Sequence, residues 1–139
     1  MKTEKAGARI IISGKRKTAV AKLSFKPGKG EVFFNYLPYQ ELNTFHRLAI
    51  LEPLRIFEKN LGPLEYDLFI RVQGGGREAQ IQAARLAIAR ALVKITGSEV
   101  LRKAYLAYDR NMLVQDSRRK EASKPGDSAP RAKRQKSYR

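Results

Sequence analysis

The pattern of apolar and polar positions divides the chain into a region that can form a core and a region that cannot. Apolar residues recur across 10–116, alternating in some stretches and following helical spacing in others. Apart from prolines, 117–139 holds only four apolar or aromatic residues: Ala122, Ala129, Ala132 and Tyr138. A segment with so little to bury cannot offset the entropy lost on ordering, so we expect it to be disordered in isolation. The pattern predicts a globular body over 1–116 and an extended tail over 117–139.

Within the body, four stretches have the spacing of β-strands. A run of three isoleucines is typical of a short buried strand, and three later stretches are short apolar runs or alternate with period two. Glycine, proline and lysine clusters between them indicate turns. The expected strands cover 10–12, 18–25, 31–35 and 66–72, with polar turns at 13–17 and 26–30.

Two stretches have helical spacing. Over 44–59 Pro53 interrupts the pattern, so we expect a short helix or two pieces there. The stretch 77–96 is the clearest helix, with Gly97 as its C-cap and Ser98 as the N-cap of a short helix that follows. On the clearest helix, six apolar residues share one face (Ile81, Ala84, Ile88, Ala91, Leu92, Ile95) and three polar ones the opposite face (Glu78, Gln82, Arg85). Together these elements predict an α/β (α+β) domain, a small mixed sheet of about four strands packed by two to three helices.

Both regions are strongly basic. The net charge is +16, from 29 Lys and Arg against 13 Asp and Glu. The stretch 117–139 holds nine of these cations and two acids, which leaves 20 cations and 11 acids in the body. Such a balance indicates a polyanionic partner, with nucleic acid favoured over an anionic membrane.

The composition argues against several kinds of site. There is no cysteine, which excludes disulfides, thiolate metal sites and a cysteine nucleophile, and His46 is the only histidine. The acids are dispersed, and no acid/base pair or Ser-His-Asp arrangement stands out. No signal peptide begins the chain, and no apolar window approaches the ~18 residues of a membrane span. We therefore expect a soluble cytosolic protein that is not an enzyme and has no metal or cofactor.

Three glycines followed by Arg77 lie between the last expected strand and the clearest helix. The segment fits neither a dinucleotide loop nor a Walker loop, because the third glycine of the first and the Lys-Ser/Thr of the second are missing. It can be a tight strand-to-helix turn, or its backbone and Arg77 can contact a phosphate at the helix N-terminus.

Two short basic clusters have the same two interpretations, solvated surface or phosphate contact. The first is Lys15, Arg16 and Lys17, and the second is Arg118, Arg119 and Lys120 at the start of the tail. Phosphate contact is the favoured interpretation for both, because the whole chain is so basic.

The histidine and the tyrosines also divide into residues with a structural interpretation and one that could contact RNA. His46 is expected to be packed or solvated, and Tyr105 and Tyr108 to belong to the core or its edge. Tyr138 has no core near it in the sequence, so we hypothesise that it stacks on a base or packs on a ribose.

Three blocks of sequence resemble one known family. The stretch 74–92, GGGREAQIQAARLAIARAL, resembles the signature of the small-subunit ribosomal protein S-nine family. The block 14–21, GKRKTAVA, is similar to the family's N-terminal basic block, and the ending QKSYR is similar to that of its archaeal and eukaryotic branch. One departure is in the tail, where 123–130 lacks an aromatic residue found in many relatives and adds Asp127.

The resemblance implies a fold and a function. The fold would be like the second domain of ribosomal protein S-five, with a left-handed βαβ crossover. The protein would be a structural constituent of the small ribosomal subunit, bound to rRNA and neighbouring proteins in the head and not homo-oligomeric. Its tail would reach the peptidyl-tRNA site and contact the anticodon stem-loop.

The candidate contacts follow from the basic clusters and from the resemblance together. Those expected to bind rRNA are Lys15, Arg16, Lys17, Arg77, Arg118, Arg119, Lys120, Lys124, Arg131, Lys133 and Arg134. Those expected to contact tRNA are Lys136, Tyr138 and Arg139. An architectural DNA-binding protein with a basic arm is the alternative, and an RNA-modifying enzyme would need a catalytic site that the sequence does not indicate.

Overall fold

The computed structural model describes residues 10–126 and 129–133. The strands are β1 (Ile12–Arg16), β2 (Ala19–Pro27), β3 (Val32–Phe34), β4 (Leu37–Pro38) and β5 (Tyr66–Gln73). The helices are α1 (Thr44–Leu61), α2 (Arg77–Thr96) and α3 (Glu99–Tyr108), with short 3-10 helices η1 (Tyr39–Glu41) and η2 (Arg110–Met112).

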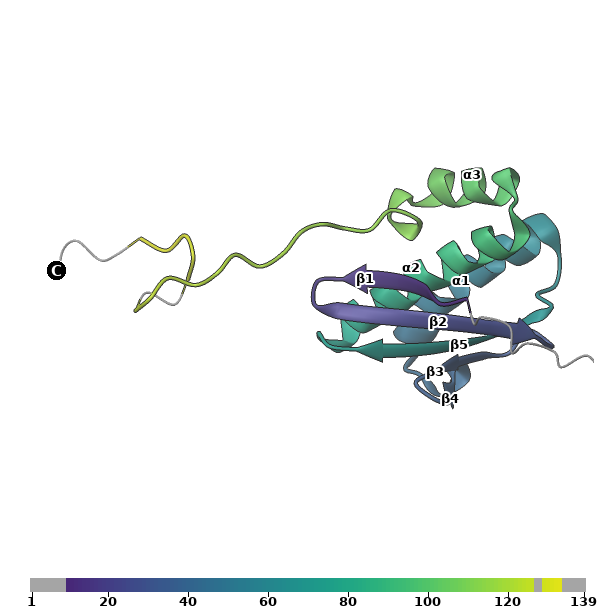
Figure 1. Cartoon of the computed structure of the whole chain (residues 1–139), viewed down its shortest axis with the longest axis horizontal. Helices are drawn as coiled ribbons and strands as arrows, with labels where there is room; N and C mark the ends of the chain where they lie inside the picture. Colours follow the sequence, from purple (N-terminus) through teal and green to yellow (C-terminus); the bar gives the residue numbers. More distant parts are fainter. Residues whose placement is uncertain (1–9, 127–128, 134–139) are drawn as a thin grey trace, which may run out of the picture.

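The strands form one mixed sheet in the order β1-β2-β5-β3-β4. Among the described strands, β3 and β5 form the parallel pair, and α1 lies in the connection between them. All three helices lie on one side of the sheet, α2 and α1 nearer to it and α3 farther out (Figure 1). The expected mixed α/β fold is confirmed, with five strands in place of about four because β4 adds two residues. The left-handed crossover and the likeness to ribosomal protein S-five stay predictions.

The prediction for the first strand holds only for Ile12, which is buried in β1, and is wrong for Ile10 and Ile11. Ile10 and Ile11 are 49% and 60% exposed, and the strand instead runs through the polar stretch assigned to a turn. Its buried positions are Ile12 and Gly14, and a Cβ on Gly14 would lie 2.2 Å from the carbonyl oxygen of Ala83 on α2. The helix sits directly on the backbone of β1. An inward glycine carries no hydrophobic signal, so the stretch has the polarity of a turn.

Pro53 does not break the first helix, contrary to expectation. α1 is one helix of 18 residues with Pro53 inside it and buried. The proline removes one N–H donor, but Ile50, Leu54 and Phe57 are buried on both sides of it and hold the two halves against the core. The buried Tyr105 hydroxyl also donates to the Pro53 carbonyl at 2.7 Å.

The bounds of α2 are those expected from sequence, 77–96. The expected C-cap of α2, Gly97, and the expected N-cap of α3, Ser98, are both confirmed. Gly97 has a left-handed φ of 61°, and the Ser98 hydroxyl accepts from the Leu101 N–H at 3.4 Å. The expected solvent side of this helix is wrong for Arg85, which is only 9% exposed. The reason is that α1 and α3 pack on the side of α2 away from the sheet.

The helix after Ser98 is longer than expected and continues to Tyr108. Tyr105 is fully buried, as predicted, whereas Tyr108 is 59% exposed and does not belong to the core. Burial raises the pKa of Tyr105 well above its ordinary value.

Candidate nucleic-acid interface

The triple glycine packs against the β1–β2 turn. Gly74 and Gly75 both have left-handed φ angles, 74° and 67°. A Cβ on Gly74 would lie 2.7 Å from the Thr18 carbonyl oxygen, and one on Gly75 would lie 2.9 Å from the Ala19 nitrogen. These two glycines therefore serve a tight strand-to-helix turn that no side chain would permit. This contact brings the turn with Lys17 and the start of α2 with Arg77 to the same end of the body.

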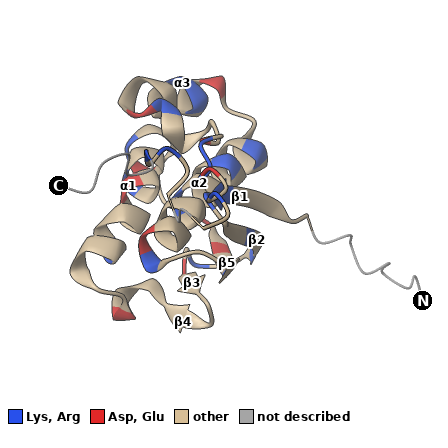
Figure 2. Cartoon of the chain, turned by 90° about the vertical axis from the view of Figure 1, so that its left-hand side faces the viewer, with Lys and Arg blue, Asp and Glu red and all other residues tan. Residues whose placement is uncertain are grey.

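The tail begins at that same end. Asp116 forms an ion pair with Arg16 at the end of β1, and it also accepts the backbone N–H and the guanidinium of Arg118 at 2.9 and 2.8 Å. Arg90 on α2 donates to the carbonyls of Leu113 and Ser13 at 3.0 and 3.1 Å. These bonds tie the last segment of the body to β1. Figure 2 faces this end and shows Lys and Arg gathered around β1 and α2.

The predicted rRNA-binding residues differ in their exposure and in whether an acid already pairs with them. Those exposed and without an acid partner among the described residues are Lys15, Lys17, Arg77, Arg119, Lys120, Lys124 and Lys133. Arg16 is paired with Asp116, and so is Arg118, which stays largely exposed at 81% of its side chain. The predicted contacts at Arg134, Lys136, Tyr138 and Arg139 lie outside the described residues.

Arg131 has an acid partner inside the tail. Its guanidinium donates to the carboxylate of Glu121 at 2.6 and 3.1 Å. The Arg131 side chain lowers the pKa of Glu121 below its ordinary value, and the two groups lie in open solvent. An exposed pair of this kind adds little stability, so Arg131 can exchange the carboxylate for a phosphate.

A buried cation that the sequence did not reveal is Arg85. It pairs with Glu52 of α1 at 2.6 Å and with Asp109, just after α3, at 3.1 Å. Its Nε has no hydrogen-bond partner among the described residues. This arginine links the helices of the body.

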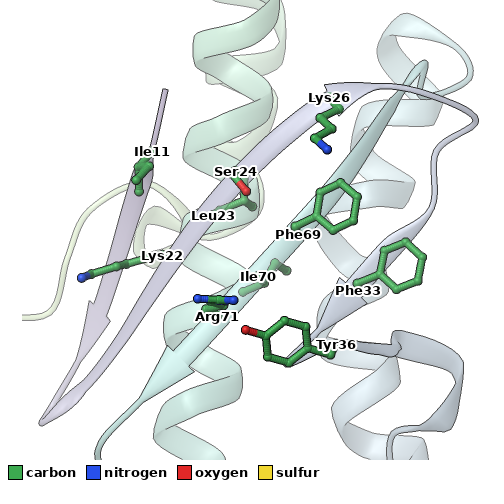
Figure 3. Close-up of a pocket in the computed structure, with 10 residues that line it drawn as sticks. All are labelled: Ile11, Lys22, Leu23, Ser24, Lys26, Phe33, Tyr36, Phe69, Ile70 and Arg71. Carbon is green, nitrogen blue, oxygen red and sulfur yellow. The ribbon is translucent and has the colours of Figure 1, made fainter. Parts of the chain in front are cut away.

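Sequence reasoning also missed a basic and aromatic cluster on the face of the sheet opposite the helices. Phe33, Phe69 and Tyr36 lie there beside Arg71 and two lysines of β2 (Figure 3). A signal was available. If Leu68, Ile70 and Val72 face the core, then Phe69 must face outward, and an outward phenylalanine is unusual on an exposed sheet.

The described part of the chain shows neither a metal site nor a membrane-spanning helix. Across 10–126 and 129–133, no three His, Cys, Asp or Glu side chains gather as a metal site would require. No described helix combines the length and apolarity needed to span a bilayer. The single histidine, His46, is hydrogen-bonded to Glu78 at 2.7 Å and joins the starts of α1 and α2.

The sequence profile of the family described as Ribosomal protein S9/S16 matches residues 14–139. The chain belongs to this family. It is 41% identical over 128 residues to a protein of Methanothrix thermoacetophila named small ribosomal subunit protein uS9, covering 91% of this chain and 96% of that one. Identity to the uS9 proteins of Methanococcus maripaludis and Methanococcus vannielii is 40% and 39%, each covering 91% of this chain and 95% of the relative. The resemblance expected from three sequence blocks is confirmed along nearly the whole chain.

Proposed function

We propose that this protein is a structural component of the small subunit of the cytoplasmic ribosome, bound to rRNA in the head of the subunit. The observation that carries the proposal is the match to the S9/S16 family over 14–139, with archaeal relatives named as small-subunit proteins. The structure supports it through the basic end of the body, where Lys15, Lys17 and Arg77 are exposed beside the origin of the tail. The proposal involves no catalytic step, no cofactor, no membrane and no homo-oligomer.

Within this role, 1–116 is the anchoring body and 117–139 is a string of cations that follows rRNA. Extended residues span up to ~3.3 Å each, so a tail of this length can reach on the order of 75 Å from the body. We propose that it threads rRNA through Arg118, Arg119, Lys120, Lys124, Arg131, Lys133 and Arg134, and that Lys136, Tyr138 and Arg139 contact peptidyl-site tRNA at its anticodon stem-loop. Such contact must be independent of sequence, because one site accepts every elongator tRNA.

The test of the assembly role is sedimentation of the tagged chain through a sucrose gradient at moderate salt. Co-sedimentation with small subunits, resistant to nuclease directed at DNA, is the expected result. Migration with the nucleoid and bending of duplex DNA would instead favour an architectural DNA-binding protein.

The test of the tRNA contact is deletion of 137–139. We expect subunits that assemble nearly normally and bind tRNA at the peptidyl site about 1–2 kcal/mol more weakly, the contribution of one or two charge-assisted contacts. A matched control is Lys94→Gln, which removes one exposed cation from α2. Equal tRNA affinity in the deletion and in the control would refute the contact.

A further inference from the structure

The sheet face opposite the helices carries an aromatic pair that no element of the described chain covers. Phe33 on β3 and Phe69 on β5 are register neighbours, with ring centroids 5.3 Å apart and an interplanar angle of 5°. Both rings are half-buried, and the helices all lie on the other face (Figures 1 and 3). The exposed sides of the two rings form a continuous aromatic surface.

Cations surround this aromatic pair. Lys22 of β2 lies directly opposite Arg71 of β5 in register, although like charges in such a pair destabilise a sheet. Lys26 places its Nζ 5.7 Å from the centroid of the Phe69 ring. None of the three forms an ion pair with an acid that the structure describes. Folding alone does not explain three unpaired cations on one face.

An acid on this face, Asp67, does not neutralise them. Asp67 lies opposite Lys26 in register, but its Oδ1 accepts three backbone N–H groups of the β2–β3 turn, at 2.9, 3.1 and 3.0 Å. The carboxylate is therefore committed to holding that turn. The face keeps a net positive charge around an aromatic centre, which complements an anion carrying flat apolar groups.

Tyr36 is held in a strained conformation that extends the same surface. Asn35 and Tyr36 in the β3–β4 turn have φ angles of 47° and 70°. Asparagine tolerates this region, whereas a bulky aromatic residue there is an outlier that costs stability. The turn places the Tyr36 ring 4.7 Å from the Arg71 guanidinium and leaves the residue 72% exposed. The strained turn keeps an aromatic ring on the surface, at the edge of the area formed by Phe33 and Phe69.

We propose that this face, formed by Phe33, Phe69, Tyr36, Lys22, Lys26 and Arg71, binds an unpaired stretch of RNA. Bases stack on the three rings, and phosphates lie against the three cations. The charge favours a polyanion, and the open rings favour unpaired bases, because a duplex keeps its bases inside. The shallow cavity between them has a volume of about 480 Å³. The assignment of rRNA as the natural partner rests on the proposed ribosomal function. The binding of unpaired RNA by this face does not depend on that function.

The first test measures the affinity of the full chain for a labelled 12-nucleotide oligo-uridine by fluorescence anisotropy. Salt on the order of 0.2 M weakens the electrostatic contribution of the tail. Tyr36→Gly removes the ring and relieves the positive φ, so we expect a higher melting temperature together with about 5-fold or more weaker binding. Phe33→Leu with Phe69→Leu keeps apolar packing and should weaken binding at least as much. Affinities of both variants within twofold of the unaltered chain would overturn the proposal.

The second test separates this face from general charge. The plot of log affinity against log salt has a negative slope. Lys22→Gln with Lys26→Gln should make it shallower by about 1.4, because two phosphate contacts at ~0.7 each are lost. The matched control, Lys94→Gln with Lys103→Gln, removes two exposed cations from the helical layer and should change the slope much less. Equal slopes in the two double variants would contradict the proposal, as would equally tight binding of a 12-base-pair RNA duplex that is lost with the same rings.

The third test uses subunits. Chains with Tyr36→Gly should still co-sediment but leave a short unpaired rRNA segment more reactive to chemical probing. If nucleotide reactivity is unchanged and a neighbouring protein is lost instead, the face binds protein and the proposal is wrong. Failure of the unaltered chain to co-sediment would reject the ribosomal function, while the oligo-uridine result would still decide whether this face binds RNA.

Discussion

The body and the tail are both basic, yet their described cations differ in the contacts that they make. In the body, Arg16, Arg85 and Arg90 are engaged with acids or carbonyls and hold helices, strand and C-terminal segment together. In the described part of the tail beyond Arg119, side-chain hydrogen bonds run only between Arg131 and Glu121, and helix and strand are absent. In the body, the net charge therefore overstates the number of cations without a partner. Among the described residues of the tail beyond Arg119, Arg131 alone has an acid partner.

The largest test of this comparison removes 121–139 and leaves the contacts of Asp116 intact. The truncation takes away six Lys and Arg and two acids. We expect the salt slope of rRNA-fragment binding to fall by up to roughly 4, and the affinity at low salt to fall by about a hundredfold or more. The free energy of unfolding, measured in urea, should change by less than about 0.5 kcal/mol because none of the removed residues that the structure describes lies in the core. A large loss of stability would show that the tail is part of the folded unit.

The opposite test damages the body and spares the tail. A Cβ at Gly14 would meet the Ala83 carbonyl oxygen at 2.2 Å and the Ala87 nitrogen at 2.8 Å, both backbone atoms of α2. Gly14→Ala should therefore force the helix off β1 and lower the free energy of unfolding by about 2–3 kcal/mol. The matched control is Gly76→Ala, where a Cβ would meet nothing within 4 Å. It should cost at most about 1 kcal/mol as a helix N-cap change. Equal costs would mean that the close approach at Gly14 is not what constrains the sheet.

Gly14 also shows where sequence reasoning succeeds and fails. The limits of α2 were predictable because glycines mark both ends, and β5 because its inward positions are all apolar. β1 was not, since one of its two inward positions, Gly14, is a glycine whose neighbour is more than 60 residues away in sequence. Arg16 and Asp116 are 100 positions apart, and no local pattern announces their pairing. Candidate cations could be named from sequence, but which of them are already occupied depends on tertiary contacts.

A smaller effect is expected from the buried arginine. Arg85→Met keeps much of the side-chain length but leaves Glu52 and Asp109 without their shared partner. The acids are 38% and 33% exposed, so water compensates in part, and we expect a loss of about 1–2 kcal/mol. Arg102→Met is the control, since its pair with Glu99 is largely exposed and 3.6 Å long. That variant should change stability by less than about 0.5 kcal/mol, and rRNA affinity should be similar in both because neither arginine belongs to the proposed interface.

The smallest effect tests whether the tail's own ion pair competes with RNA. Arg131 lowers the pKa of Glu121, so the pair is present above the ordinary glutamate pKa of about 4.3 and is lost as the pH falls through the lowered value. In a carboxyl-carbon NMR titration, Arg131→Gln should move the Glu121 inflection upward, whereas Lys124→Gln should move it much less. Glu121→Gln frees the guanidinium at neutral pH, and rRNA binding should tighten by about twofold or less, since an exposed pair holds its cation weakly. Weaker binding of RNA by Glu121→Gln would show that the pair presents Arg131 to RNA and does not compete for it. The tail would then have local order of its own, and the contrast with the body would be smaller than the charge pattern implies.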